Sequence, residues 1–175
     1  MLSRFYPNEY CQSVFNIDYI RLREQFDTLI FDIDNTLAFY DVAEPTKELV
    51  SFFAGLSQKG FKICLLSNGR EQRVKKFNEK LSLVFISHAK KPGQKGLVRA
   101  LGLLAATADG AVIIGDQLFT DIWCGNRSGL HSILVRPLSD REEWFVKLKR
   151  IPEKLVLHFY RKSLEGGTNN AHSKE

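Results

Sequence analysis

Residues 31–41 read FDIDNTLAFYD, and this stretch decides the fold because it joins an apolar strand to a group of carboxylates. The residues before it, TLI at 28–30, are typical of a buried strand, and Asp32 and Asp34 stand where that strand ends. A carboxylate in such a place is costly unless something binds it. The two aspartates therefore indicate a bound partner at the end of a core strand.

Outward from this stretch, five apolar runs alternate with helical patterns. The runs are continuously apolar, which is typical of strands that are covered on both faces. Strand alternating with helix predicts an α/β fold with a doubly wound, Rossmann-like parallel sheet of five strands. The strands are expected at 28–33, 62–67, 83–87, 111–116 and 132–137, and the helices within 45–60, 70–81, 93–104 and 120–130.

Polar residues follow four of these strands. In doubly wound sheets the chemistry gathers at the carboxyl ends of the strands, which meet at one edge. We therefore expect these side chains to lie together. They are Asp32 and Asp34 after the first strand, Ser67 and Asn68 after the second, Lys90 and Lys91 after the third, and Asp116 and Asp121 after the fourth.

Taken in order, these motifs resemble the haloacid dehalogenase-like (HAD) superfamily of phosphohydrolases. The resemblance covers roughly residues 29–137 and includes DIDNT at 32–36, Ser67, Lys91 before Pro92, and GDQLFTD at 115–121. Within the superfamily, four segments most resemble the type IIIA branch: FDIDNTL, LSNG, KKPG and GDQLFTDIWCGNRSG. That branch includes bacterial YqeG-like proteins and mitochondrial phosphatidylglycerophosphatases.

The resemblance implies a role for each motif residue. Asp32 would be the nucleophile that forms an aspartyl-phosphate, and Asp34 would be the general acid and base. Ser67, Asn68 and Lys91 would hold the phosphate, with Lys91 also neutralising charge on Asp32. A magnesium ion would be bound by Asp32, Asp116 and Asp121 and by the backbone carbonyl of Asp34.

Elementary electrostatics favours the same chemistry. A carboxylate that attacks a phosphate dianion at ~3.5 Å meets a repulsion of about 9 kcal/mol at an effective dielectric of ~20. A divalent cation held by neighbouring carboxylates can offset this repulsion. Hard oxygen ligands with an open position for phosphate suit Mg²⁺.

Each motif residue also has a plainer interpretation. Asp34 could cap a turn, Ser67 could belong to an ordinary loop, and Asp121 could cap a helix. Lys90 competes with Lys91 for the catalytic position, and the following proline favours Lys91.

The length of 175 residues and the apolar fraction of 44% suit one soluble domain with a full hydrophobic core. We divide the chain into an N-terminal flanking segment (1–27), the HAD-like core (28–138), a basic, aromatic helical segment (139–163) and a disordered tail (164–175). No apolar stretch is long enough for a transmembrane helix. Three scattered cysteines and no secretory signal predict a cytoplasmic protein.

The net charge of +5 is concentrated near the C-terminus. Residues 147–162 hold six Lys or Arg and a single Glu among several aromatic and aliphatic side chains. This composition suits an interfacial helix on anionic lipid, at the inner face of a membrane, or less well a nucleic-acid contact. Alternatively, the basic residues form a solvated helix face, and the aromatic residues of both flanking segments pack on the sheet.

The spacing between the motifs leaves no room for a cap domain over the site. An open site suits a phosphate presented on something large, such as a phosphorylated lipid head group. The substrate that we favour is phosphatidylglycerophosphate. Two alternatives are a phosphatase for another target (a nucleic-acid end, a phosphoprotein or a metabolite) and a non-enzymatic module that binds RNA or membrane.

Overall fold

The computed structural model describes residues 2–138, 156–157 and 160. The predicted C-terminal helical segment therefore lies mostly outside the described residues, and the predicted tail at 164–175 lies wholly outside them.

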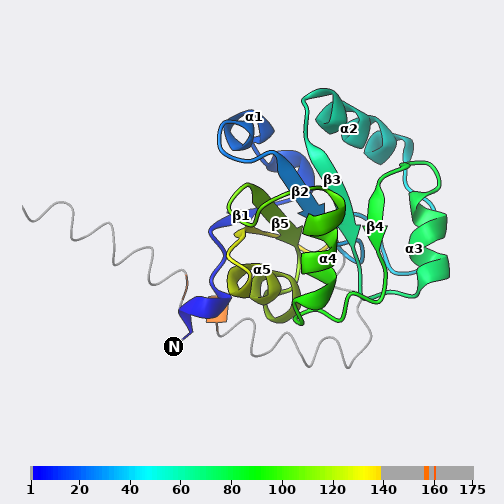
Figure 1. The fold of residues 1–175 in the computed structure, drawn as a ribbon. Coiled ribbons are helices and arrows are strands. Elements are labelled where there is room, and N and C mark those ends of the chain that lie inside the picture. Colours follow the sequence, from blue (N-terminus) through cyan, green and yellow to red (C-terminus); the bar gives the residue numbers. More distant parts are fainter. Residues whose placement is uncertain (1, 139–155, 158–159, 161–175) are drawn as a thin grey trace, which may run out of the picture.

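A parallel six-stranded sheet forms the centre of the molecule (Figure 1). All of its strand pairs are parallel, and the strand order is β1-β6-β5-β2-β3-β4. The predicted α/β, doubly wound fold is confirmed. The strands are β1 (Glu9–Cys11), β2 (Thr28–Phe31), β3 (Lys62–Leu66), β4 (Val84–Ile86), β5 (Ala111–Gly115) and β6 (His131–Val135).

The prediction of five strands was one strand short. The extra strand, β1, comes from the N-terminal flanking segment and pairs with β6 at the edge of the sheet, with Glu9 opposite Ile133. Its three residues include Glu9 and the exposed Tyr10, so it has no apolar run. A short edge strand of this kind carries no clear periodic signal.

Helices cover both faces of the sheet. Alternate residues of each strand point to opposite faces and bury their side chains under different helices. Leu29 and Phe31 of β2 lie in the core cluster that includes α1, α2 and α3, whereas Ile30 lies in the cluster with α4 and α5. The helices are α1 (Tyr19–Arg23), α2 (Lys47–Gln58), α3 (Glu71–Asn78), α4 (Lys95–Leu103) and α5 (Trp123–Arg127). Short turns add η1 (Ser3–Phe5), η2 (Val14–Asn16) and η3 (Leu118–Ile122).

The connections at the carboxyl edge of the sheet are short. Residues 32–46 between β2 and α2, and 67–70 between β3 and α3, contain no helix and no strand longer than an isolated bridge. Among the described residues, nothing folds over this edge as a cap domain. The predicted absence of a cap therefore holds for these two connections.

Aromatic residues of the flanking segments pack on the body of the protein. Phe5 lies edge-on against Phe119 and Trp123, with ring centroids 5.0 and 5.1 Å away. In the C-terminal segment, Val156 is buried beside η3 and β6, and the Tyr160 ring lies 5.3 Å from that of Tyr6. For these residues the packing interpretation holds, and the basic residues at 147–154 lie outside the described part. None of the described helices is both long and apolar enough to span a bilayer.

Candidate active site

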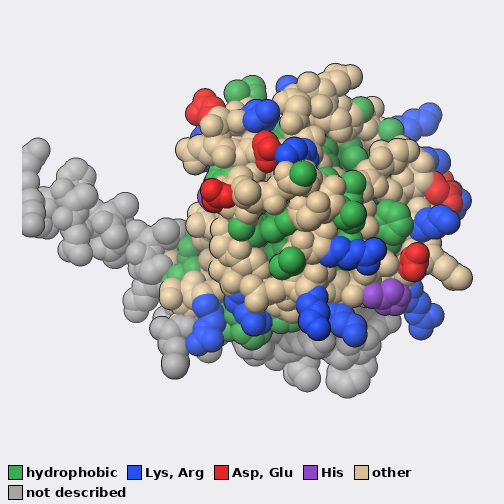
Figure 2. Space-filling view, viewed as in Figure 1, with side chains coloured by type: hydrophobic (Ala, Val, Ile, Leu, Met, Phe, Trp, Pro, Cys, Tyr) green, Lys and Arg blue, Asp and Glu red, His purple; other side chains and the backbone are tan. Residues whose placement is uncertain are grey.

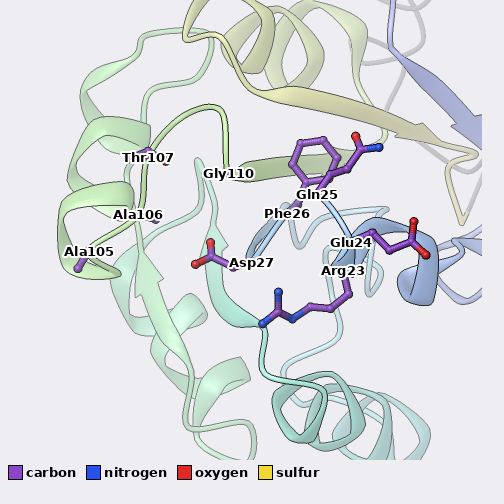
Figure 3. Close-up of a pocket in the computed structure, with 9 residues that line it drawn as sticks. All are labelled: Arg23, Glu24, Gln25, Phe26, Asp27, Ala105, Ala106, Thr107 and Gly110. Carbon is purple, nitrogen blue, oxygen red and sulfur yellow. The ribbon is translucent and has the colours of Figure 1, made fainter.

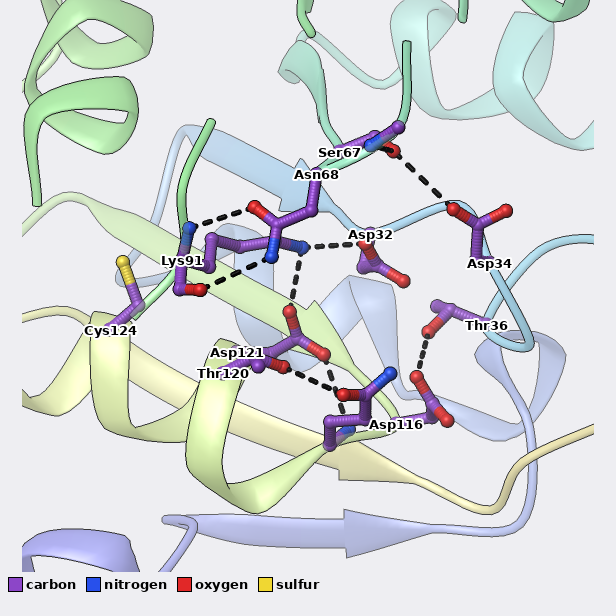
Figure 4. Close-up of polar contacts among 12 residues, drawn as sticks. Asp32, Asp34, Thr36, Ser67, Asn68, Lys91, Asp116, Thr120, Asp121 and Cys124 are labelled. Carbon is purple, nitrogen blue, oxygen red and sulfur yellow. Dashed lines mark hydrogen bonds and ion pairs between the residues drawn. The ribbon is translucent and has the colours of Figure 1, made fainter. Parts of the chain in front are cut away.

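Three carboxylates converge where β2 and β5 end (Figure 4). Asp32 directly follows β2, Asp116 directly follows β5, and Asp121 comes from the π-helical turn η3. All three residues are buried, and each offers a carboxylate oxygen within 4.8 Å of the other two. The tertiary structure thus brings together three of the four residues that were predicted to bind metal.

The ammonium of Lys91 lies between two of these carboxylates. Its Nζ is 2.5 Å from Asp32 Oδ1 and 2.6 Å from Asp121 Oδ1, and its side chain is 2% exposed. Burial alone would lower the pKa of Lys91, but Asp121 and Asp32 outweigh burial and raise it above the ordinary value. Lys91 is therefore a permanent cation at neutral pH. The neighbouring Lys90 is exposed, so the structure places Lys91, and not Lys90, in the site.

Burial also changes the protonation of Asp32. The pKa of this carboxyl rises to about 7, chiefly through burial, with Asp121 raising it further and Lys91 opposing both. The site has one ammonium opposite three carboxylates, so it holds an excess of negative charge when all three are ionised. Additional positive charge in the site would favour the ionised form of Asp32.

The residues fit a divalent metal ion. Hard carboxylate oxygens are the donors that such ions prefer. Asp121 Oδ1 is buried and, among the described residues, pairs with the Lys91 ammonium but accepts no hydrogen bond of good geometry. Asp121 Oδ2 accepts from the backbone N–H of Gln117 at 3.1 Å, which orients the carboxylate. Donor type, charge excess and burial therefore all suit a cation held by Asp32, Asp116 and Asp121.

Gly115 makes room for this carboxylate cluster. A Cβ at this position would lie 2.5 Å from side-chain atoms of the buried Asp121. We predict that Gly115→Ala displaces Asp121, weakens Mg²⁺ binding at least ~10-fold and destabilises the fold by roughly 1–3 kcal/mol. Calorimetric titration with Mg²⁺ and thermal unfolding measure the two effects.

Gly102 in α4 supplies the matched control, because a Cβ there meets nothing within 4 Å. Gly102→Ala should keep the metal affinity and raise the stability slightly, since alanine favours helix. Equal metal affinity in the two alanine variants would show that the position of the Asp121 carboxylate does not depend on a glycine at position 115.

Asp34 lies away from the three-carboxylate cluster and faces a different partner. Its Oδ2 accepts a long hydrogen bond of 3.5 Å from Ser67 Oγ, and its Oδ1 lies 2.7 Å from Arg73 Nη2. Burial raises the pKa of Asp34, while Arg73 and then Lys91 lower it. The Asp34 side chain is thus placed to exchange a proton, and its predicted metal contact was through the backbone carbonyl.

Ser67 and Asn68 follow β3 in different roles. The Ser67 hydroxyl accepts from the backbone N–H of Gly69 at 2.9 Å, so it is fixed beside Asp34. The Asn68 side chain is engaged with the backbone of Lys91: Oδ1 accepts from Lys91 N at 2.7 Å and Nδ2 donates to Lys91 O at 3.1 Å. Asn68 thereby fixes the loop that carries the lysine, and among the described residues its backbone N–H is the group left for a phosphate.

Two further residues contact the site and had been given no role. The Thr36 hydroxyl donates to Asp116 Oδ1 at 3.3 Å, although Thr36 stands inside the first motif. Arg73 lies in the first turn of α3, shortly after the loop Ser67-Asn68-Gly69. This short distance from the loop was the one sign in the sequence that Arg73 could reach the site. Neither residue could be assigned from residue type alone.

A separate hollow lies at the opposite edge of the sheet (Figure 3). It has a volume of about 350 Å³ and lies where β2 and β5 begin, next to Asp27 and Gly110. Its lining holds none of the residues of the carboxylate cluster. This hollow and the carboxylate cluster are therefore separate features of the protein.

Known proteins with related sequences include HAD-like hydrolases and phosphatases. The family model described as HAD-hydrolase-like matches residues 88–160. The chain is 36% identical over 159 residues to the probable phosphatase YqeG of Bacillus subtilis (strain 168). The aligned region covers 90% of this chain and 92% of that protein. It is 27% identical over 154 residues to phosphatidylglycerophosphate phosphatase 1, chloroplastic/mitochondrial, of Arabidopsis thaliana, over 82% of this chain but only 44% of that protein.

Solved structures support the fold. NagD from E. coli K-12 superposes with a TM-score of 0.55 at 16% identity, over 69% of this chain and 94% of that chain. At this identity the likeness concerns the fold alone. The match to YqeG, in contrast, extends over nearly the whole length of both chains.

Proposed function

Because the chain belongs to the HAD-like phosphatase family, as its match to YqeG shows, we propose that it is an Mg²⁺-dependent phosphomonoesterase that converts phosphatidylglycerophosphate to phosphatidylglycerol and inorganic phosphate. The observation that carries the proposal is the buried Asp32–Lys91–Asp121 arrangement beside Asp116, at a sheet edge that no cap domain covers among the described residues. The lipid substrate is supported by the related plant enzyme, of which this chain spans less than half.

In the first proposed step, an oxygen of Asp32 attacks the phosphorus, and the bond from phosphorus to the leaving alkoxide breaks. Asp34 gives its proton to the leaving oxygen, so the alcohol departs neutral. Lys91 remains an ammonium throughout and stabilises negative charge on Asp32 and on the phosphoryl group. A magnesium ion held by Asp32, Asp116 and Asp121 would supply further positive charge for the phosphoryl oxygens.

In the second step, Asp34 takes a proton from water as the water oxygen attacks the phosphorus. The bond between Asp32 and phosphorus breaks, inorganic phosphate leaves and both carboxyl groups return to their initial state. Ser67 Oγ and the backbone N–H of Asn68, at the end of β3, would bind phosphoryl oxygens, while the N–H of Gly69 donates to Ser67 Oγ and fixes that hydroxyl.

The rim of the carboxyl edge suits a membrane surface. Phe39, Tyr40 and Leu138 are exposed by 43%, 69% and 44%, and the backbone N–H of Leu138 donates to Asn35 O in the first motif, which places it beside the site. Lys and Arg side chains gather along the lower edge in Figure 2, on the side where α4 begins. Exposed cations in the strand-end loops and at the start of α4 are Arg70, Lys90, Lys95 and Arg136, against the acids Asp41 and Glu71.

We therefore propose that the protein meets anionic lipid with this rim, where aromatic side chains and cations both contribute to binding. The cysteines at 11, 64 and 124 are free thiols, which is compatible with the reducing cytoplasm. We accordingly propose that the protein lies at the cytoplasmic face of the membrane.

Phosphate release from phosphatidylglycerophosphate tests the function. With Mg²⁺ we expect release from lipid in mixed micelles, and with EDTA we expect less than about 1% of that rate, because the carboxylate repulsion is then unrelieved. A dihexanoyl form of the same lipid, which is soluble as a monomer, should be hydrolysed with lower kcat/KM if the rim contributes. Mg²⁺-dependent release from an aryl phosphate without release from the lipid would keep the phosphatase and refute the lipid substrate.

A further inference from the structure

Arg73 joins the acid–base residue to the loop after the first motif. Its Nη2 lies 2.7 Å from Asp34 Oδ1 and donates to Phe39 O at 3.2 Å, while its Nε donates to Tyr40 O at 2.8 Å. The guanidinium also stands 5.2 Å from the centre of the Tyr40 ring. One side chain from α3 therefore contacts the carboxylate and two consecutive backbone carbonyls of the β2 loop.

The burial of Arg73 sets it apart from the other cations of the same helix. Its side chain is 16% exposed, whereas Lys76, which pairs with Glu44 and Glu79, is 49% exposed. Arg73 Nη1 is buried without a hydrogen-bond partner among the described residues. An unsatisfied buried donor destabilises a fold, so helix stability alone does not account for an arginine here.

The position of Asp34 suggests what the arginine does. Oδ1 faces Arg73, and Oδ2 faces Ser67 at the phosphate end of β3, as Figure 4 shows for Ser67 and Asp34. Asp34 Oδ1 accepts no hydrogen bond of good geometry among the described residues, so the ion pair with Arg73 is what holds it. The guanidinium is itself fixed by two backbone carbonyls, so this ion pair restricts the rotamer of the carboxylate. The other oxygen is then directed to the side where the phosphate would lie.

We propose that Arg73 is a positioning residue that holds Asp34 Oδ1, so that Oδ2 delivers the proton to the leaving oxygen. The role rests on the proposed phosphatase function and adds a residue to it. Arg73 itself does not touch the substrate; it acts through the orientation of Asp34. Because proton delivery matters most when the leaving alkoxide is basic, loss of Arg73 affects alkyl phosphates more than activated aryl phosphates.

The test compares two substrates at the level of kcat/KM, which reports the steps up to release of the alcohol. For Arg73→Met we expect kcat/KM to fall about 30- to 100-fold with an alkyl phosphate such as phosphatidylglycerophosphate or glycerol 3-phosphate. With 2,4-dinitrophenyl phosphate, whose leaving group needs no proton, the fall should stay within about 3-fold. Arg73→Lys should recover part of the alkyl activity, because it restores a cation without the planar geometry.

Two further variants complete the experiment. Lys76→Met removes an exposed cation of the same helix and should leave both substrates unaffected. Arg73→Met combined with Asp34→Asn should lose no more alkyl activity than Asp34→Asn alone, because both changes remove the same proton transfer.

Equal losses on both substrates would overturn the proposal and leave Arg73 as a structural residue. A multiplicative loss in the double variant would also overturn it. If the wild-type protein hydrolyses neither ester in the presence of Mg²⁺, the proposed phosphatase reaction itself fails, and the role of Arg73 in it fails with it.

Discussion

Asp32→Asn should lower kcat at least ~10⁴-fold on any phosphate ester while the fold is retained. The substituted asparagine is nearly isosteric with the carboxylate, but its amide is neither an anionic nucleophile nor a charged metal ligand. Asp32 is only 6% exposed, so the substitution acts inside the buried cluster and leaves the surface of the protein unchanged. Phosphate release from an aryl phosphate measures the loss, and mass spectrometry of the quenched enzyme detects the phosphorylated aspartate.

Asp41→Asn is the matched control, because Asp41 follows the same strand but is exposed. It should retain activity within about 2-fold, as expected for a surface change of this kind. Substantial turnover by Asp32→Asn would show that another residue is the nucleophile. An inactive Asp41→Asn variant would instead indicate that charge around the loop, and not the position of Asp32, controls the reaction.

The same variant, Asp32→Asn, should alter how stability depends on pH without metal. The folded-state pKa of Asp32 is raised from 3.8 to about 7, so between these values the folded protein binds more protons than the unfolded chain. This group therefore makes the wild-type protein less stable as the pH rises from about 4 to about 7. Thermal unfolding in EDTA should show a weaker decline over this window for Asp32→Asn.

Lys91→Met should produce the largest loss of stability at the site, together with a loss of activity of at least ~10²-fold. Removal of the ammonium leaves Asp32 and Asp121 facing each other in a buried site. Breaking a buried ion pair by removing one partner costs about 3–5 kcal/mol. For a chain of this length that corresponds to a fall in melting temperature on the order of 10 °C. Thermal unfolding in EDTA measures it.

Two comparisons make this prediction specific. Added Mg²⁺ should recover part of the melting temperature of Lys91→Met, because a bound cation relieves the same repulsion. Lys90→Met removes the adjacent but exposed lysine, and its unfolding free energy should stay within about 0.5 kcal/mol of wild type. Equal destabilisation of the two variants would contradict the placement of Lys91 between the carboxylates.

Most of the sheet could be predicted because its strands are buried on both faces. Runs such as TLIF in β2 and AVIIG in β5 are apolar throughout, and these two strands fall inside the predicted ranges. The edge strand β1 could not be found this way, since Glu9–Cys11 has one partner strand and a mixed composition. Local periodicity reports burial, and an edge strand is only partly buried.

The sequence by itself determined that Asp32, Asp116 and Asp121 would meet, because residues that follow parallel strands share one edge of the sheet. The sequence also favoured Lys91 over Lys90 through the following proline, and the structure places Lys91 in the site. Only the tertiary structure decided that Asn68 holds the backbone of Lys91 and that Arg73 faces Asp34. These contacts depend on loop conformations and on side chains from separate elements. Their physical basis is long-range packing, which strand and helix patterns do not encode.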